Sequence, residues 1–441
     1  MDKLIINGNK RLQGEINVSG AKNVAMKVLL ASILTDEEII INNIPKISSV
    51  IGTMDILRYL GVTVKWISMH SVSLKGDRIN SHEVPLDLGG FYRTGTMIMG
   101  PLLARLNNAV VPNPGGCRIG KRPIDRHVEG LKAMGAEIDY RDGYFYAKTK
   151  GLKGVKFRFK SNTHTGTETL ILAAVLAAGE TILENAAEEP EVDDLIRMLN
   201  LMGAQIKRIK KRTIVISGVK SLRGIEFDVM PDRNEVVTFA IAAIATRGEL
   251  IVNGTQREYL KSFLDKLSEV YAGWEALDDH RTKFFYKKNL KETNMTTSYY
   301  PGFMTDWQAP WTLLMTQAQG ISTVHETVYE DRFGYVSELI KMGAKIDFFQ
   351  PQIINPLKTY NFNWTDRDKE LCQAIKIYGK SQLHNAIVEV SDLRAGATLL
   401  IGSLLAEGES IITGIDHIDR GYERIEDRLK AVGADIIRAK V

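Results

Sequence analysis

The sequence predicts a mixed α/β protein made of two similar domains, and three observations lead to this prediction. One unit, an apolar helix followed by a turn and a β-rich strand, occurs six times along the chain. An amphipathic helix, a turn and a further strand follow each copy, so every unit mixes helix and strand. The chain has 441 residues, and a single core stops growing near about 250 to 300 residues, so the six units divide into two domains of three.

One long array of βα units is the alternative arrangement. It would need right-handed crossovers into a single parallel sheet. The repeated pairs of strands do not favour such a sheet, so the two-domain arrangement is the prediction carried forward.

The apolar helices and the strands after them fall in six segments: 23–45, 95–115, 167–187, 236–256, 310–330 and 396–416. The amphipathic helices and their strands follow in the segments 54–66, 128–140, 195–208, 264–277, 336–348 and 424–438. Glycine ends most of these second helices, where the chain needs a left-handed backbone conformation. The fourth unit reads EVYAGWEALDDH (269–280) and lacks the glycine-alanine turn.

Composition excludes several classes of protein. A formal net charge of +4 is too small to indicate a nucleic-acid partner, so any cationic function must come from local clusters. No apolar run reaches the roughly 18 residues that span a bilayer, and the first residues alternate like strands rather than forming a signal peptide. With two cysteines and no His/Cys cluster at ligand spacing, we expect no disulfide framework and no metal, and a reducing cytoplasm fits best.

The stretch PNPGGCRIGKRP (112–123) has glycines and a lysine at the spacing of a nucleotide-binding P-loop. A P-loop needs a hydroxyl residue after the lysine, whereas Arg122 and Pro123 stand there, so a P-loop is not predicted. Cys117 lies between the glycines, among Arg118, Lys121 and Arg122. This electropositive setting favours thiolate chemistry, and a small buried apolar side chain is the alternative role.

Polar residues precede each apolar helix. We expect six of them to cap these helices: Ser19, Thr94, Thr163, Asp232, Thr305 and Asp392. Arg93, Arg233 and Arg394 lie beside three of these caps. Helix N-termini carry positive potential, so two facing domains would enclose an anion-attracting cleft. Each lead-in alone could be an ordinary cap with solvated charges.

The stretch HIDRGYERIEDRL (417–429) is the most densely charged part of the chain. Arg420 precedes the helix and is predicted to reach a site. Arg424 and Arg428 are predicted to lie on the helix surface, where pairing with neighbouring carboxylates explains them.

Motifs along the whole chain resemble the family of UDP-N-acetylglucosamine 1-carboxyvinyltransferases, and they occur in the family's order. They are SGAKN (19–23), PGGCRIGKRPIDRH (114–127), ENAAEEPEV (184–192), MPDR (230–233), TD (305–306), ETVYEDRF (326–333), SDLRAGA (391–397) and HIDRGYERIED (417–427). The resemblance implies two inside-out, barrel-like α/β domains of three repeats each, with a cleft between them, a fold shared with the shikimate-pathway enolpyruvyl transferase. It implies that residues 22–231 form one domain, and that residues 1–21 and 232–441 form the other.

The resemblance also implies an enzyme. Its reaction transfers the enolpyruvyl group of phosphoenolpyruvate to the 3-hydroxyl of UDP-N-acetylglucosamine through a tetrahedral ketal, with release of phosphate. In the family this is the first committed step of peptidoglycan synthesis, a cytoplasmic reaction that uses no cofactor or metal and is blocked by fosfomycin. The implied partners are these two substrates, with no nucleic acid and no membrane insertion.

Catalytic roles come from the same resemblance, residue by residue. Cys117 matches the proton donor, and Asp306 matches the carboxylate that accepts the sugar proton, with an ordinary cap-region aspartate as the alternative. The remaining matches are Lys22, Arg122 and Arg420 for the phosphate of phosphoenolpyruvate, Arg394 for its carboxylate, Asp392 near the reacting carbon and Asn23 as a substrate contact.

The nucleotide sugar is matched by Arg93, Arg122, Pro123, Ile124, Asp125, Arg126, Thr163, His164, Thr165 and Val328. This sequence departs from the family at Arg126, where an apolar residue is usual, and at His164, where a smaller residue is usual. The segment 345–390 is longer than the family's usual connection and could change a surface or a partner. Cys372 matches no family motif and is predicted to be structural.

Two other functions remain open at this point. The altered run 163–167 would suit a relative that enolpyruvylates another uridine nucleotide. A non-catalytic nucleotide-sugar binder is the second alternative, but pure binding would not require the thiol of Cys117.

Overall fold

The computed structural model describes residues 2–113, 115, 119–121 and 123–440. Two predicted site residues, Cys117 and Arg122, lie outside these described residues. The chain splits into two compact units. Unit 1 comprises Met1–Ser19, Cys117–Arg122 and Pro231–Val441, and unit 2 comprises Gly20–Gly116 and Pro123–Met230.

Unit 1 contains three four-stranded sheets, with the strand orders β21-β22-β1-β23, β15-β16-β14-β2 and β17-β18-β20-β19. Its strands are β1 (Asp2–Asn7), β2 (Gln13–Asn17), β14 (Glu249–Asn253), β15 (Gly273–Ala276), β16 (Arg281–Phe285), β17 (Asn294–Thr296), β18 (Gly320–His325), β19 (Lys345–Phe349), β20 (Ala374–Gly379), β21 (Ile387–Glu389), β22 (Glu409–Thr413) and β23 (Asp435–Lys440). Its helices are α9 (Arg233–Ala245), η2 (Arg257–Leu260), α10 (Lys261–Glu269), η3 (Thr305–Trp307), α11 (Gln308–Thr316), α12 (Val336–Lys341), α13 (Pro356–Thr359), η4 (Trp364–Asp366), α14 (Leu393–Leu405), α15 (Asp416–Asp419) and α16 (Ile425–Ala431).

Unit 2 contains two four-stranded sheets, β13-β3-β5-β4 and β11-β12-β10-β9, and the three-stranded sheet β6-β8-β7. Its strands are β3 (Glu38–Asn42), β4 (Thr63–Trp66), β5 (Val72–Lys75), β6 (Asn108–Pro112), β7 (Glu137–Arg141), β8 (Tyr144–Lys148), β9 (Lys156–Arg158), β10 (Glu180–Glu184), β11 (Gln205–Lys210), β12 (Thr213–Ser217) and β13 (Glu226–Asp228). Its helices are α1 (Lys22–Leu30), η1 (Ala31–Leu34), α2 (Ser48–Tyr59), α3 (Leu86–Gly89), α4 (Thr94–Met97), α5 (Met99–Leu106), α6 (Asp125–Ala133), α7 (His164–Ala174) and α8 (Pro190–Leu201). The predicted α/β class is thus confirmed.

The four-stranded sheets share one pairing pattern. In the sheet around β14, β2 pairs parallel with β14, while β14 with β16 and β16 with β15 pair antiparallel. The sheet around β10 repeats this pattern in unit 2, with β9 parallel to β10 and two antiparallel pairs beyond it. Buried and partly exposed residues alternate along β10 and β14, so each strand turns one face towards the core.

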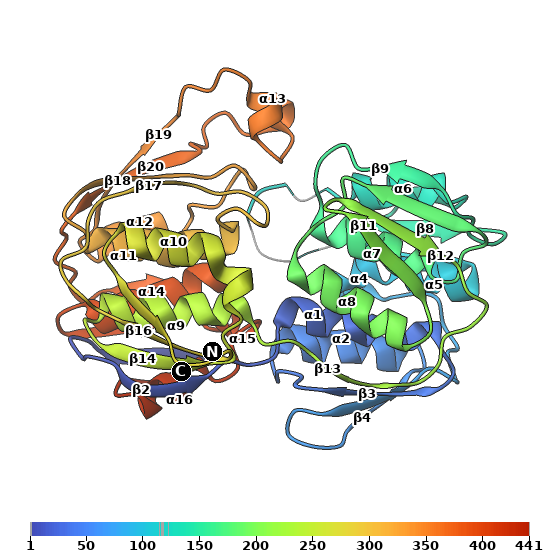
Figure 1. Ribbon diagram of the computed structural model, residues 1–441, viewed down its shortest axis with the longest axis horizontal. Coiled ribbons are helices and arrows are strands. Elements are labelled where there is room, and N and C mark those ends of the chain that lie inside the picture. Colours follow the sequence, from blue (N-terminus) through green and yellow to red (C-terminus); the bar gives the residue numbers. More distant parts are fainter. Residues whose placement is uncertain (1, 114, 116–118, 122, 441) are drawn as a thin grey trace. The chain divides into compact units, whose positions relative to one another are not determined.

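The most apolar helices form the cores of the units. Every residue of α9 and of α11 is buried, and α9, α11 and α14 contact one another in unit 1 (Figure 1). In unit 2, α7 contacts α5, α6 and α8 and is buried from Gly166 to Ala174. None of the helices in the described ranges is both long and apolar enough to cross a membrane.

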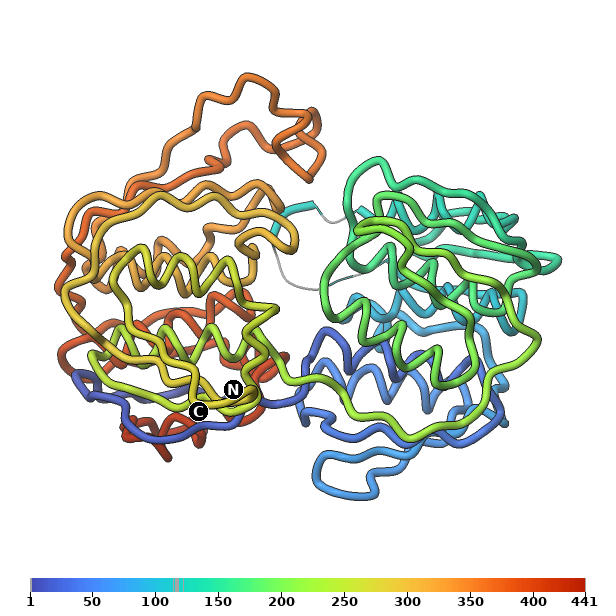
Figure 2. The backbone as a smooth tube through the Cα atoms, viewed as in Figure 1, coloured from blue at the N-terminus to red at the C-terminus, as the bar shows by residue number. Residues whose placement is uncertain are grey.

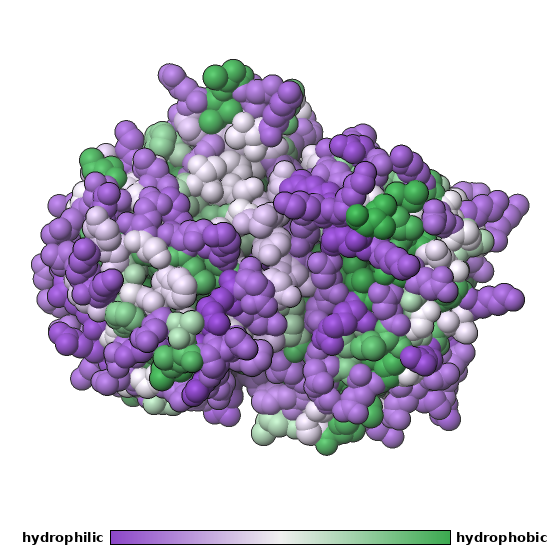
Figure 3. All heavy atoms as spheres, viewed as in Figure 1, coloured by the Kyte–Doolittle hydropathy of each residue, from purple (hydrophilic) through white to green (hydrophobic). Residues whose placement is uncertain are grey.

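Both ends of the described chain belong to unit 1. The first strand, β1, pairs antiparallel with the last, β23, and the two ends of the tube in Figure 2 lie close together. The face of the molecule in Figure 3 is mostly hydrophilic, with hydrophobic residues in separate groups. One such group lies around α13, in the long segment 345–390, where Ile354 and Leu357 are exposed.

Three of the six predicted helix caps are correct. Thr163, Asp232 and Asp392 cap α7, α9 and α14, and each side chain accepts a hydrogen bond from a backbone N–H of the first turn.

The other three predicted caps, Ser19, Thr94 and Thr305, are wrong, because each residue has a different partner. The Ser19 N–H donates to Glu235, and Ala21 holds the capping position of α1 without a side-chain hydrogen bond. The Thr94 hydroxyl lies 3.0 Å from that of Thr53, and the Thr305 hydroxyl donates to Glu326.

The charged helix α16 differs from its prediction at one residue. Arg424 is exposed and pairs with Asp427, as a surface arginine should. Arg428, in contrast, makes two 2.7 Å hydrogen bonds to the buried carboxylate of Glu235 on α9. Arg428 therefore fastens α16 to the core of unit 1.

Candidate active site

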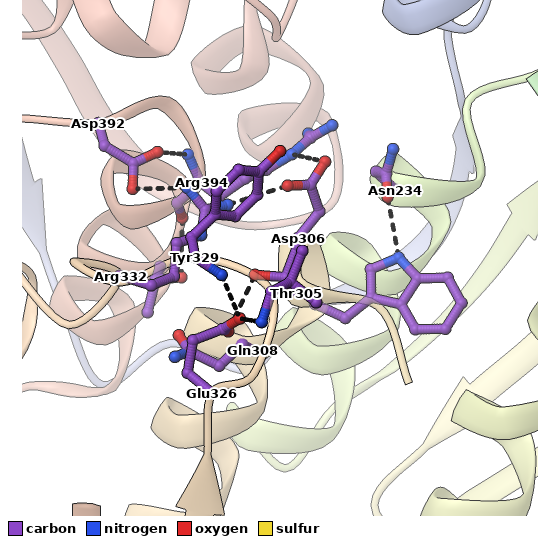
Figure 4. A network of polar contacts seen from close by, with 12 residues as sticks. Asn234, Thr305, Asp306, Gln308, Glu326, Tyr329, Arg332, Asp392 and Arg394 are labelled. Carbon is purple, nitrogen blue, oxygen red and sulfur yellow. Dashed lines mark hydrogen bonds and ion pairs between the residues drawn. The ribbon is translucent and has the colours of Figure 1, made fainter. Parts of the chain in front are cut away.

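A buried group of opposite charges lies in unit 1, where η3, α14 and the loop after β18 meet (Figure 4). Arg332 Nη2 lies 2.9 Å from Asp306 Oδ1, and Arg332 Nη1 lies 3.4 Å from Asp392 Oδ2. Arg394 Nε lies 3.7 Å from Asp306 Oδ2. The two arginine side chains are 4% exposed, whereas that of Asp306 is 27% exposed. Asp306 is therefore the member that a ligand can reach most easily.

Arg394 is held by the start of α14 and by an aromatic ring. The capping carboxylate of Asp392 accepts a 3.0 Å hydrogen bond from Arg394 N, and the guanidinium lies 5.2 Å from the centre of the Tyr422 ring. Burial disfavours the charge, but Tyr422, Asp306 and Asp232 together raise the pKa of Arg394 above its ordinary value. Arg394 thus remains a cation inside the protein.

Glu326 organises the loop that carries Arg332. Its Oε1 accepts hydrogen bonds from Val328 N at 2.7 Å and Tyr329 N at 3.1 Å, and its Oε2 accepts one from Thr305 at 2.9 Å. Burial raises the pKa of Glu326, although these hydrogen bonds oppose the shift. Because Thr305 precedes Asp306, these bonds place the loop beside η3 and bring Arg332 to Asp306.

A second group of predicted residues meets in unit 2, at the start of α7. The side chain of Thr163 caps the helix, and Thr165 Oγ1 lies 3.0 Å from His127 Nε2 on α6. Arg126 Nη1 donates a 2.9 Å hydrogen bond to Asn162 O, so this arginine does not simply point into solvent. The predicted nucleotide residues of α6 and α7 are therefore neighbours.

Other predicted residues of unit 2 lie at the starts of α1, α4 and α6. Arg93 Nη2 donates to Pro123 O at 3.3 Å. Ile124 is buried at the N-cap of α6, and Asp125 is exposed in its first turn. Lys22 and Asn23 begin α1 and are partly exposed.

Three further residues from the sequence analysis lie in unit 1: Arg420, Lys121 and Cys372. Arg420 ends α15 and is partly exposed. Lys121, next to the undescribed Arg122, donates from its backbone N to Glu330 Oε1 at 2.9 Å and from Nζ to Asp366 O at 2.5 Å. Cys372, predicted to be structural, is partly exposed and lines an open pocket of about 430 Å³ with Arg332 and Phe333.

Sequence reasoning missed four charged residues, two in the group of unit 1 and two at the contact between α1 and α7 in unit 2. Arg332 and Glu326 stand in the quoted motif ETVYEDRF (326–333), but no role was assigned to them. Lys27 and Glu168 are buried in α1 and α7, and their Nζ and Oε2 atoms lie 3.2 Å apart. The available signal was a charge inside each apolar helix pattern. No group of His, Cys, Asp and Glu in the described ranges is arranged to hold a metal ion.

Comparison with known proteins places this chain among the carboxyvinyltransferases. The family model for EPSP synthase (3-phosphoshikimate 1-carboxyvinyltransferase) matches residues 6–429, so the chain belongs to this family. Within it, the chain is similar to proteins named UDP-N-acetylglucosamine 1-carboxyvinyltransferase. It is 39% identical to that of Hydrogenovibrio crunogenus, with 100% of both chains covered, and 40% identical to that of Magnetococcus marinus, with 99% of both covered.

Solved structures support the fold. The enolpyruvyl transferase NikO from Streptomyces tendae superposes with a TM-score of 0.86 at 22% identity, covering 100% of this chain and 99% of that one. EPSP synthase from Acinetobacter baumannii superposes with a TM-score of 0.71 at 16% identity, with both chains fully covered. At these identities the likeness concerns the fold alone.

Proposed function

We propose that this protein transfers the enolpyruvyl group of phosphoenolpyruvate to the 3-hydroxyl of UDP-N-acetylglucosamine and releases phosphate. The observation that carries the proposal is the 39 to 40% identity, over essentially the full length, to proteins named for this activity. The reaction would be the first committed step of peptidoglycan synthesis. We propose a cytoplasmic location, which suits the small number of cysteines.

The chemistry requires one addition and one elimination. The sugar oxygen bonds to C2 of phosphoenolpyruvate while its proton leaves, and C3 gains a proton, which gives the tetrahedral ketal. C3 then loses a proton, the C2–O bond to phosphate breaks, and the enolpyruvyl double bond forms again. A base, an acid and cations for two anionic groups are therefore needed.

Unit 1 supplies the base and two cations in this proposal. Asp306 accepts the proton of the sugar hydroxyl, because it is the most exposed carboxylate of its group, and the two guanidinium groups that face it fix its position. Arg394 binds the carboxylate of phosphoenolpyruvate, and Arg332, bonded to both Asp306 and Asp392, fixes the direction of both carboxylates. Asp392 acts near the reacting carbon.

The other proposed roles rest on the motif matches. Cys117 protonates C3, and the phosphate is bound by Lys22, Arg122 and Arg420. The nucleotide sugar is bound by Asn23, Arg93, Pro123, Ile124, Asp125, Arg126, Thr163, His164, Thr165 and Val328. In unit 2, Arg93 bonds to Pro123, Arg126 to Asn162 and Thr165 to His127, and these contacts support a common role for the predicted residues among them.

We further propose that the two units correspond to inside-out, barrel-like domains of three repeats each, formed by residues 22–231 and by residues 1–21 with 232–441. The shared strand pattern of the four-stranded sheets supports this proposal. So do the central helices α9, α11 and α14, each of which packs on its own sheet.

The decisive experiment measures phosphate release from phosphoenolpyruvate with UDP-N-acetylglucosamine, with UMP, and without an acceptor. We expect release with the nucleotide sugar only. Release only with UMP would favour a relative that acts on another uridine nucleotide, an alternative motivated by His164. No release with any acceptor would leave a non-catalytic binder.

The thiol has its own test. Cys117→Ser should abolish most turnover, because a hydroxyl is a much weaker acid than a thiol. Cys117→Asp, which keeps an acid at this position, should retain activity and escape fosfomycin. Full activity of the serine variant would remove Cys117 from the mechanism.

A further inference from the structure

Three charged or titratable side chains meet inside unit 2, at the contact between α1 and α7. Glu168 Oε2 lies 3.2 Å from Lys27 Nζ, and Glu168 Oε1 lies 3.1 Å from His164 Nε2. The side chains of Lys27 and Glu168 are 3% and 0% exposed. The other buried residues of these helices are mostly apolar. The proposed chemistry uses neither Lys27 nor Glu168.

A buried ion pair such as this one is weak evidence of a stabilising role. Removing two ions from water costs several kcal/mol per ion, and a well-packed apolar pair of similar volume is often as stable or more stable. Buried charges with a specific partner beside a predicted binding residue instead indicate a functional role.

The pair connects two helix starts. Lys27 Nζ donates a 2.5 Å hydrogen bond to Asn23 O in the first turn of α1. At the other end, Glu168 contacts His164, the first residue of the 11-residue helix α7, whose side chain keeps 23% of its surface exposed. His164 is therefore the member of the network that a ligand can touch.

Several charges surround His164. Glu168 lies one turn along its own helix, Lys27 comes from α1, and Glu189 from the N-cap of α8. On α6, His127 contacts the neighbouring Thr165, and Arg126 bonds to Asn162 O. Burial and Lys27 disfavour the imidazolium, but Glu168 and Glu189 outweigh them and raise the pKa of His164.

We propose that His164 is a specificity-determining residue: the Lys27–Glu168 pair holds its imidazolium at the start of α7, where it binds the phosphoryl oxygens of the acceptor nucleotide. The N-terminus of a helix adds positive potential at the same place. This inference rests on the proposed function, and it concerns how the acceptor's charge is recognised. Glu168 is a positioning residue, since it acts through His164.

The test compares binding of UDP-N-acetylglucosamine with binding of uridine by calorimetry, at about pH 6 and about pH 9, on either side of the ordinary range for histidine. The diphosphate of the nucleotide sugar is a diester whose charge does not change between these values. Uridine has no phosphate and serves as the ligand control. The variants are His164→Gln and, as a matched control, His70→Gln at the exposed turn between β4 and β5.

The wild type should bind UDP-N-acetylglucosamine about tenfold more tightly at the lower pH, because His164 loses its charge as the pH rises through its raised pKa. His164→Gln should lose this difference, and His70→Gln should keep it. Uridine affinity should be similar in all three proteins at both pH values, apart from any change in the nucleobase.

A further variant, Glu168→Gln, tests whether Glu168 acts through His164. Without the carboxylate, the imidazolium loses its main partner, so the pH dependence of binding should shift to lower pH. Binding of UDP-N-acetylglucosamine that is independent of pH, or a pH dependence retained in His164→Gln, would overturn the inference and leave the proposed function intact. Failure to bind this nucleotide sugar at any pH would overturn both.

Discussion

The charge network around Asp306 in unit 1 and the one around Glu168 in unit 2 differ in which of their members is exposed. In unit 1, Arg332 and Arg394 lie between carboxylates from different elements, and Asp306 is itself 27% exposed. In unit 2, Lys27 and Glu168 are enclosed, and His164, which contacts Glu168, is 23% exposed. In the first network a ligand can reach a charged member directly, at Asp306. In the second, the ion pair itself is buried and its neighbour His164 is the exposed member.

The largest effect on activity is expected at Asp306, the exposed member of the network in unit 1. Asp306→Asn keeps the shape of the side chain but removes the base, so kcat should fall by about 10² to 10⁴-fold with little change in KM for the nucleotide sugar. Steady-state phosphate release measures both. Asp265→Asn, at an exposed pair with Lys261 on α10, is the matched control and should be fully active. A kcat within threefold of the wild type would contradict the role of Asp306.

Arg332 should have the next largest effect. Arg332→Lys keeps a charge but loses the planar guanidinium fork, whose two separate nitrogens face Asp306 and Asp392. We expect kcat/KM for phosphoenolpyruvate to fall by about 10²-fold. Arg424→Lys, at an exposed position of the same unit, should change nothing. An equal loss of kcat/KM in Arg332→Lys and Arg424→Lys would mean that the loss does not come from the contacts of Arg332 with Asp306 and Asp392.

In unit 2, the enclosed pair should be replaceable as far as stability is concerned. Glu168→Leu leaves Lys27 as an unpaired buried charge, so the free energy of unfolding should fall by about 3 to 5 kcal/mol. Adding Lys27→Met should restore most of this loss, since the double variant has an apolar contact between α1 and α7. Urea unfolding, monitored with a probe in unit 2, measures the free energy of unfolding of the single and the double variant. A double variant no more stable than Glu168→Leu would mean that the ion pair itself stabilises the unit.

Sequence reasoning was most successful where local patterns decide the structure. Each of the six apolar segments contains a buried helix followed by a strand, because long apolar runs leave the chain few other arrangements. The caps Thr163, Asp232 and Asp392 were correct because their partners lie within a few residues.

Errors arose where a distant partner decides the contact. Arg428 was expected at the surface but bonds to Glu235, 193 residues away. Thr305 was expected to cap a helix but bonds to Glu326, 21 residues away. Local periodicity carries no information about such pairs. For the same reason, the motif match found Asp306, Asp392 and Arg394, but only the structure showed that Arg332 joins them.

The smallest expected effect concerns a turn that the two units build differently. After α8 in unit 2, Gly203 has a φ of +103°, and an added Cβ would meet nothing within 4 Å. After α10 in unit 1, Tyr271 occupies the same kind of turn with a φ of +65°. A left-handed conformation costs about 1 kcal/mol for a residue other than glycine. Lys288 Nζ lies 3.9 Å from the centre of the Tyr271 ring and offsets part of this cost.

Substitutions at the two turns should therefore have opposite signs. Gly203→Ala should lower the free energy of unfolding by about 1 kcal/mol, because alanine is strained in this left-handed conformation and its methyl group gains no contact. Tyr271→Gly should raise it by less than about 1 kcal/mol, since the contact with Lys288 is lost as the strain is relieved. Thermal unfolding of both variants checks the signs. If Tyr271→Gly is less stable than the wild type, the contact between the ring and Lys288 outweighs the backbone strain, and the tyrosine stabilises this turn.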